Sequence, residues 1–227
     1  MRVAVLGTGV VGRAIAGKLS ELGHEVVVGT RDPNETLARQ EPDYMGNPPF
    51  AAWLAEHPQV RLAGLADAAA HGELVVNATA GGASLEALRL AGAANLDGKV
   101  LVDVANPLDF SQGMPPSLSV SNTDSLAECI QREFPDARVV KTLNTVNASV
   151  MVDPGLVGGG DHTVFVSGNH PEAKALVTGL LTEGFGWRDV VDLGDITTAR
   201  GPEMFMALWL RLMGSLQTPM LNIKVVR

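Results

Sequence analysis

The chain has 227 residues and a formal net charge of −8, because 25 aspartates and glutamates outnumber 17 lysines and arginines. Its 46% hydrophobic residues exclude an intrinsically disordered chain. The acidic balance and the lack of a basic run argue against nucleic-acid and anionic-membrane partners. One cysteine excludes an internal disulfide framework and a multi-cysteine zinc site, and the scattered histidines lack metal-ligand spacing. We expect a cytoplasmic globular protein that binds no metal and acts on a small molecule.

Short β-branched runs alternate with longer amphipathic stretches over the first two thirds of the chain. Strands are predicted at residues 2–6, 24–29, 60–63, 74–78, 100–104 and 139–143. Helices are predicted at residues 10–22, 50–56, 85–94 and 125–134, the third capped by Ser84 and the last opened by Ser125 and Glu128 in capping-box spacing. This alternation predicts an α/β fold, a Rossmann-type doubly wound parallel sheet with helices on both faces.

The rhythm changes after about residue 148. Strands are predicted at residues 163–166 and 189–193, and helices at residues 171–183 and 198–213. We therefore divide the chain into a nucleotide-binding Rossmann domain, residues 1–148, and a small C-terminal α/β lobe, residues 149–227. An apolar stripe around Trp209 is either core or a dimer face, so a homodimer is an open expectation. The longest nearly apolar stretch, residues 204–213, is far short of the ~20 residues needed to cross a bilayer.

A glycine-rich turn joins the first predicted strand to the first predicted helix. Gly7 permits a tight turn, Gly9 lets backbone N–H groups approach a pyrophosphate, and Gly12 lets the helix pack closely on the strand. The helix N-terminus then presents unpaired donors and a partial positive charge to the phosphates. Because the motif directly follows a strand and opens an amphipathic helix, it predicts a dinucleotide site rather than a ligand-free turn.

The end of the second predicted strand decides which dinucleotide is expected. An NAD site usually carries an acid there, to hold the ribose 2′-hydroxyl. This chain instead has Thr30 and Arg31, and a guanidinium can form a forked pair with a 2′-phosphate. NADP is therefore the expected cofactor. In the alternative, Asp32 turns toward the ribose and restores a preference for NAD.

The sequence resembles the family of NADP oxidoreductases that includes the coenzyme F420-dependent NADP reductases, and the same core recurs in the cytoplasmic domain of membrane ferric reductases. The resemblance covers nearly the whole chain. It rests on the glycine turn, on residues 29–31, and on residues 105–108, 140–146 and 192–203. It implies a Rossmann domain with a small C-terminal lobe. It also implies that hydride passes directly between stacked nicotinamide and deazaflavin rings.

The resemblance further implies which residues contact the cofactor. Thr8, Val10 and Val11 would line the pyrophosphate, and Thr30 and Arg31 would hold the 2′-phosphate. The turn after the fourth strand would lie along the nicotinamide ribose, and the segment after the sixth strand beside the nicotinamide. The expected cofactor-binding residues also include the three glycines of the turn. The remaining ones are Ala78, Thr79, Ala105, Asn106, Asn144, Val146 and Ala148.

No side chain is predicted to be catalytic, because hydride exchange between planar rings mainly needs positioning. Lys141 resembles a hydroxyacid dehydrogenase lysine, but strand alternation places it opposite Asn144. Arg200 and Glu203 either pair with each other or hold the second substrate. Three functions stay open: NADPH-dependent reduction of F420 or a related flavin-like acceptor, reduction of a small imine, carbonyl or ferric substrate, and non-catalytic sensing of NADP.

Overall fold

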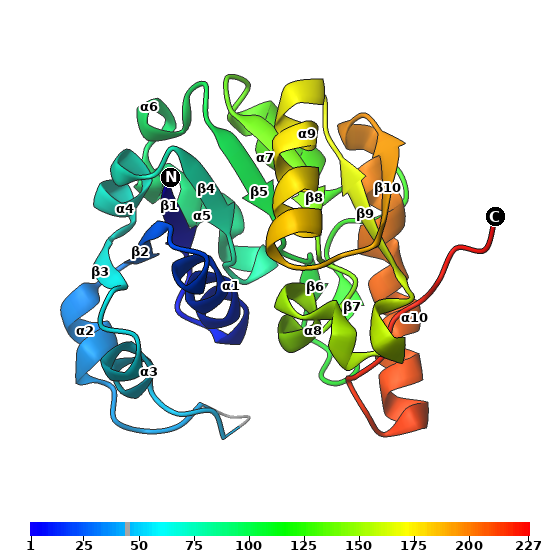
Figure 1. The fold of residues 1–227 in the computed structure, drawn as a ribbon, viewed down its shortest axis with the longest axis horizontal. Coiled ribbons are helices and arrows are strands. Elements are labelled where there is room, and N and C mark those ends of the chain that lie inside the picture. Colours follow the sequence, from blue (N-terminus) through cyan, green and yellow to red (C-terminus); the bar gives the residue numbers. More distant parts are fainter. Residues whose placement is uncertain (44–45) are drawn as a thin grey trace.

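An eight-stranded sheet runs through the computed structural model, which describes residues 1–43 and 46–227 (Figure 1). The strand order is β10-β9-β8-β5-β4-β1-β2-β3. From β8 to β3 this is the parallel order of a Rossmann fold, which confirms the predicted fold class. The strands are β1 (Arg2–Leu6), β2 (Glu25–Thr30), β3 (Arg61–Gly64), β4 (Leu74–Asn77), β5 (Val100–Asp103), β8 (Arg138–Thr142), β9 (Thr163–Ser167) and β10 (Asp189–Gly194).

Helices cover both faces of this sheet. The longer ones are α1 (Val10–Glu21), α4 (Leu65–His71), α5 (Gly81–Ala91), α7 (Leu126–Glu133), α9 (Pro171–Gly179) and α10 (Arg200–Leu216). Shorter helices are α2 (Pro33–Ala38), α3 (Phe50–Glu56), α6 (Ala93–Leu96) and α8 (Ala148–Val152), and a small hairpin pairs β6 (Leu108–Asp109) with β7 (Ser117–Leu118). None of the described helices is long and apolar enough to span a membrane.

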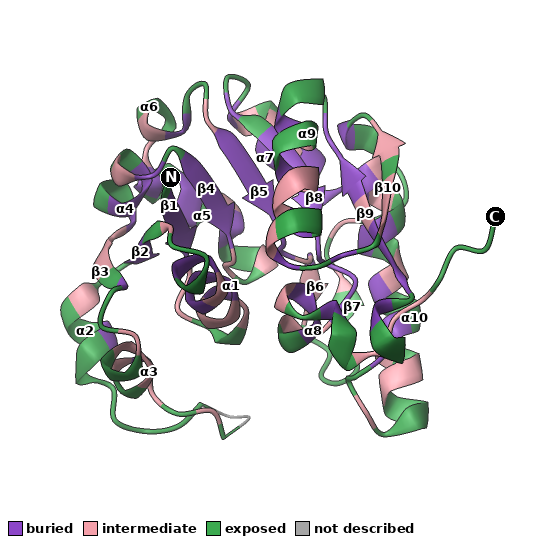
Figure 2. Ribbon diagram, viewed as in Figure 1, coloured by how far each residue is buried: buried purple, intermediate pink, exposed green. Residues whose placement is uncertain are grey.

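Strand alternation explains why the central strands of the sheet are buried on both sides (Figure 2). In β1, Val3 and Val5 face the core cluster under α1, α8 and α9, whereas Ala4 and Leu6 face the cluster under α4, α5 and α7. All four side chains are fully buried. The carboxyl ends of the parallel strands therefore meet at one edge, where their connecting loops can form a site.

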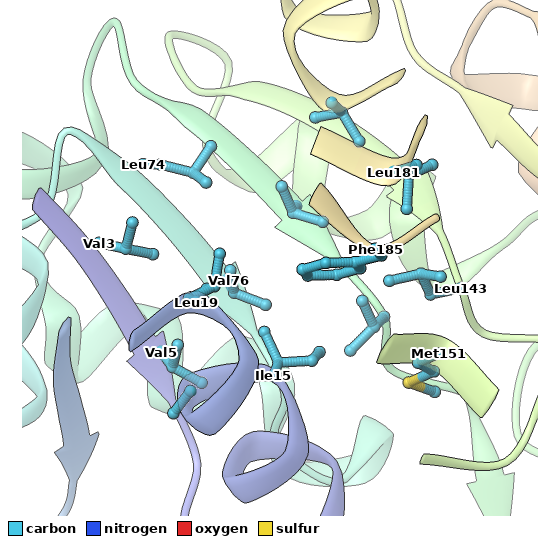
Figure 3. Close-up of a cluster of buried hydrophobic side chains, with 14 of the residues drawn as sticks. Val3, Val5, Ile15, Leu19, Leu74, Val76, Leu143, Met151, Leu181 and Phe185 are labelled. Atoms are coloured by element: carbon cyan, nitrogen blue, oxygen red, sulfur yellow. The ribbon is translucent and has the colours of Figure 1, made fainter. Parts of the chain in front are cut away.

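The C-terminal segment extends the same sheet. β9 runs antiparallel to β8, and β10 runs parallel to β9. Figure 3 shows Ile15 and Leu19 of α1 in one apolar cluster with Met151, Leu181 and Phe185 of the C-terminal segment. The predicted division at residue 148 falls where α8 begins, and the two parts share this core.

Two predicted features differ from the structure. The helix expected over residues 85–94 spans Gly81–Ala91, and Ser84 lies inside it instead of capping it, because its hydroxyl bonds to Asn77 and Thr79. The helix expected over residues 171–183 leaves α-helical geometry after Gly179 and continues as a π-helical turn, Leu180–Gly184. The start of the helix in residues 125–134 is confirmed, with Ser125 as its N-cap.

The apolar stripe of α10 divides between core and surface. Trp209 is 7% exposed and packs with Met206 and Leu221 in a third apolar cluster, whereas Leu208 is 53% exposed. Burial of the tryptophan accounts for part of the stripe. The homodimer remains a prediction.

Candidate functional site

The glycine turn between β1 and α1 is built by contacts that leave no room for side chains at two of its three glycines. Gly7 has φ +121°, and a Cβ there would lie 2.5 Å from the carbonyl oxygen of Ala78. At Gly12 a Cβ would lie 2.1 Å from the carbonyl oxygen of Gly7. At Gly9, in contrast, a Cβ would meet no atom within 4 Å. Gly7 and Gly12 are thus required by the fold, while Gly9 keeps open the space in front of the helix N-terminus.

That space belongs to a cavity of about 340 Å³, here called the first cavity. It extends from the glycine turn past the end of β2 and helix α2 to the β4–α5 turn and the first turns of α5. Its lining residues are Gly7, Thr8, Gly9, Gly29, Thr30, Arg31, Asp32, Glu35, Thr36, Arg39, Leu65, Ala78, Thr79, Ala80, Ala83, Glu86 and Ala87.

The end of β2 presents a hydroxyl and a guanidinium to the first cavity. Thr30 Oγ1 lies 2.9 Å from Thr36 Oγ1, and Arg31 is exposed. Asp32 is the N-cap of α2, because its Oδ1 accepts a hydrogen bond from the backbone N–H of Glu35 at 3.0 Å. This capping role explains why an aspartate follows Arg31 in the sequence. Asp32 also lines the first cavity, so a ribose contact remains geometrically open to it.

Helix α2 adds polar residues that the sequence analysis missed. Glu35, Thr36 and Arg39 all line the first cavity, and Arg39 Nη2 pairs with Glu35 Oε1 at 2.6 Å. The signal for them was the N-cap aspartate followed by Pro33, which begins a helix. On that helix, positions 35, 36 and 39 fall on one face.

The β4–α5 turn is anchored beneath the first cavity by a buried amide. Asn77 Oδ1 accepts a hydrogen bond from Thr79 Oγ1 at 2.6 Å, and Asn77 Nδ2 donates to Ser84 Oγ and to Asp103 Oδ1, at 3.1 and 2.8 Å. Thr79 lines the first cavity and Asn77 is fully buried. The orientation of the Thr79 hydroxyl is therefore set from inside the sheet.

Asp103 belongs to a buried charge network that reaches the C-terminal helix. Lys141 Nζ lies 2.8 Å from Asp103 Oδ2 and 2.9 Å from Glu203 Oε1, and it also donates to the carbonyl oxygen of Ala105. Burial alone would lower the pKa of Lys141, but the two carboxylates raise it above its ordinary value, so the amine stays protonated. Fully enclosed and paired, Lys141 is not available as an acid or base for a substrate.

Glu203 does not pair with Arg200. Its two oxygens accept hydrogen bonds from the backbone N–H groups of Leu126 and Ala127 at the start of α7, at 2.7 and 3.1 Å. Arg200 instead forms a two-pronged pair with Glu128, at 2.6 and 2.9 Å. Both residues therefore fix α10 to α7. The predicted mutual pairing is wrong, and a role in holding the second substrate stays a prediction.

A pair of asparagines joins the loops that follow β5 and β8. Asn106 Nδ2 donates to the backbone oxygen of Asn144 at 2.7 Å, and Asn144 Nδ2 donates to Asn106 Oδ1 at 2.9 Å and to the backbone oxygen of Pro202 at 3.0 Å. Leu143 precedes this pair with φ +60°, a left-handed conformation that costs a non-glycine residue roughly 1 kcal/mol or more. The buried side chain of Leu143 offsets this cost by packing in the core (Figure 3).

The structure brings part of the predicted cofactor site together in the first cavity. Gly7, Thr8, Gly9, Thr30, Arg31, Ala78 and Thr79 line it. The remaining predicted residues lie outside its lining, and they are Val10, Val11, Gly12, Ala105, Asn106, Asn144, Val146 and Ala148. Asn144 and Val146 are buried, and Asn144 braces two loops. Their contact with a nicotinamide stays a prediction.

The residues present fit a dinucleotide phosphate. The missing side chain at Gly9 leaves a cradle at the N-terminus of α1, and Thr30, Arg31 and Arg39 place donors at the end of β2. Within residues 1–43 and 46–227, no group of three or more histidines, cysteines, aspartates or glutamates is placed to hold a metal ion.

Comparisons with known proteins identify the family of the chain. Residues 2–107 match the model of the family described as NADP oxidoreductase, coenzyme F420-dependent. A solved structure from Arthrobacter sp. FB24, provisionally described as an F420-dependent NADP reductase, is 63% identical and covers 99% of both chains with a TM-score of 0.95.

Two curated relatives are more distant. The F420-dependent NADP reductase of Methanothermobacter marburgensis is 28% identical over 93% of this chain and 92% of that protein. The metalloreductase STEAP3 of Rattus norvegicus is 29% identical over 97% of this chain but only 38% of its own length. With these similarities and the dinucleotide cradle, the chain belongs to the coenzyme F420-dependent NADP oxidoreductase family and is an NADP-dependent oxidoreductase.

Proposed function

We propose that the protein transfers hydride between NADPH and coenzyme F420 or a related flavin-like acceptor. The observation that carries this proposal is that the buried ionisable groups near the place where we expect the reaction are already paired. Lys141, Asp103 and Glu203 are buried and paired with one another. Reduction of a hydroxyacid's keto form needs a placed lysine or histidine to supply a proton, and Lys141 is committed elsewhere. A planar acceptor needs little such chemistry.

The chain's own residues would act by positioning. Arg31 and Thr30 would bind the 2′-phosphate, and the open backbone at Gly9 would hold the pyrophosphate. Thr79, fixed by Asn77, would orient the nicotinamide ribose. When bound, the nicotinamide would supply the hydride, and the proton that completes reduction of the acceptor would come from water. The asparagine pair would keep the two loops beside the ring at a fixed separation.

The test is an acceptor panel under one set of conditions. Protein and NADPH are mixed in turn with F420, FMN, a ferric chelate, a cyclic imine and a small ketone, and oxidation of NADPH is followed by absorbance. The proposal expects rapid turnover with F420 or FMN, and slow or no turnover with the other acceptors. Turnover confined to the ferric chelate, the imine or the ketone would contradict it. Tight NADPH binding without turnover on any acceptor would favour the sensor.

A further inference from the structure

A second cavity of about 350 Å³ lies beside the first. Three residues line both cavities, namely Thr8, Thr36 and Arg39, so the two volumes meet at these side chains. Among the residues that the structure describes, Arg39 is the cation shared by the two linings. The junction therefore combines two hydroxyl-bearing residues with one guanidinium, next to Thr30 and Arg31 at the end of β2.

We propose that Arg39 is a second cationic ligand of the cofactor's 2′-phosphate and that Glu35 is its exchangeable partner. The proposal rests on the proposed function in one respect only, namely that the cofactor carries a 2′-phosphate at the end of β2. It assigns the selectivity for NADP over NAD to two arginines. Arg31 comes from the tip of β2, and Arg39 from the end of α2.

The charges lining the first cavity explain why one arginine is insufficient. Arg31 and Arg39 face three acids there: Asp32, Glu35 and Glu86. A phosphate monoester adds nearly two negative charges at neutral pH. If Arg31 alone opposed that charge, Glu35 would repel the phosphate across the same cavity. Arg39 opposes this repulsion, because it adds a second positive charge beside Glu35 and supplies further N–H donors in a planar fork.

The existing contacts of Arg39 permit the exchange. Its pair with Glu35 spans one helical turn, and the two side chains are 62% and 64% exposed. Solvent-exposed pairs of this kind contribute little to stability, so a charge-assisted bond to phosphate can replace one at little cost. α2 itself is held in place by its Asp32 cap and by Thr36, whose hydroxyl donates to the backbone oxygen of Asp32 at 2.8 Å.

The other arginine of the second cavity is committed to the fold. Arg13 Nε donates to the backbone oxygen of Thr8 at 2.9 Å, and its Nη1 donates to that of Pro48. Its guanidinium carbon lies 5.7 Å from the ring centroid of Phe50. Burial lowers the pKa of Arg13, while the charge of Asp43 opposes that shift. Reorienting Arg13 would break contacts that hold the glycine turn, whereas reorienting Arg39 breaks one exposed pair.

The experiment measures dissociation constants for NADP and NAD by calorimetry on the full chain and on Arg39→Gln. Loss of a charge-assisted bond predicts NADP binding weakened roughly 10- to 100-fold, which corresponds to about 1.4–2.7 kcal/mol, with NAD changed less than about twofold. Arg61→Gln is the matched control, because Arg61 forms a similarly exposed pair with Glu25 at 2.9 Å outside both cavities. That variant should bind both nucleotides as the natural chain does.

A competition with 2′,5′-ADP and 5′-ADP isolates the phosphate subsite from the nicotinamide end. Arg39→Gln should lower affinity for 2′,5′-ADP and leave that for 5′-ADP unchanged. Unchanged NADP binding in Arg39→Gln, or equal losses for NADP and NAD, would overturn the role of Arg39. In that case NADP binding by the natural chain would leave the proposed function standing. If the natural chain bound no NADP, both would fall.

Discussion

Replacing Glu203 by glutamine tests the buried network that ties α10 to the sheet. The carboxylate accepts three hydrogen bonds: one from Lys141 Nζ and two from the backbone N–H groups of Leu126 and Ala127. Both oxygens are used, since Oε2 faces Leu126 while Oε1 faces Ala127 and Lys141. A glutamine retains the shape but turns one of these oxygens into an amide donor. Whichever way the amide is placed, a donor faces a donor in a buried site.

The expected cost follows from this geometry. Removing one partner of a buried charge pair commonly costs about 3–5 kcal/mol, because the remaining charge loses its compensation. Lys141 keeps Asp103, which places Glu203→Gln near the lower limit, at about 3 kcal/mol. For a chain of this size, 1 kcal/mol corresponds to roughly 2–4 °C in melting temperature. We therefore expect unfolding about 6–12 °C below that of the natural chain.

Thermal unfolding followed by circular dichroism measures this shift, with denaturant titration as an independent value for the free energy. Glu21→Gln is the matched control, since Glu21 is exposed at the end of α1 and the same chemical change should move the melting temperature by less than about 2 °C. Equal melting temperatures for Glu203→Gln and the natural chain would refute the reasoning, because the network would then contribute nothing to stability.

Two further predictions concern the glycine turn and acid stability. Gly9→Ala should unfold like the natural chain yet bind NADPH at least tenfold more weakly by calorimetry. Gly12→Ala, whose Cβ would lie 2.1 Å from the Gly7 oxygen, should melt several degrees lower, and the reverse pattern would contradict both assignments. Hydrogen bonding to Arg132 lowers the pKa of Asp124 to about 2 from 3.8, so its stabilisation, about 1 kcal/mol after solvent screening, is complete above pH 4 and lost as the pH falls toward 2. Asp124→Asn should lack that part of the acid transition in urea titrations at pH 2–5, and an unchanged profile would speak against it.

The sheet was predictable because its strands are short continuous apolar runs bounded by glycines and polar turns. The expected strand at residues 2–6 matches β1, and the other expected strands differ from the structure by about one residue at either end. Prediction failed where tertiary contacts override local signals. Ser84 has the chemistry of an N-cap, yet the close approach of Gly81 to the Asn106 backbone lets α5 begin four residues earlier than a cap at Ser84 implies.

The site divides in the same way. The sequence predicts the glycine turn, because the spacing of Gly7, Gly9 and Gly12 directly reflects the backbone geometry. The sequence does not predict that Arg39 lines the cavity, because its position there depends on the direction of α2 relative to β2. Glu203 was not readable either, because its partners Leu126 and Ala127 lie more than 70 residues away and are backbone groups with no sequence signature.

The two ends of the site are held by opposite kinds of interaction. At the end of β2, Arg39 and Glu35 form an exposed pair, and pairs of this kind contribute little to stability. At the end where we expect the nicotinamide, Lys141 donates a hydrogen bond to the carbonyl oxygen of Ala105. Lys141 belongs to a buried charge network, and removing its charged groups from water is costly. Hydride transfer requires a precise spacing between the two rings, whereas flexible charged side chains can bind a phosphate. Because α10 supplies Glu203 to that network, the C-terminal segment helps to set the geometry where we expect the reaction, and the first 107 residues alone would lack it.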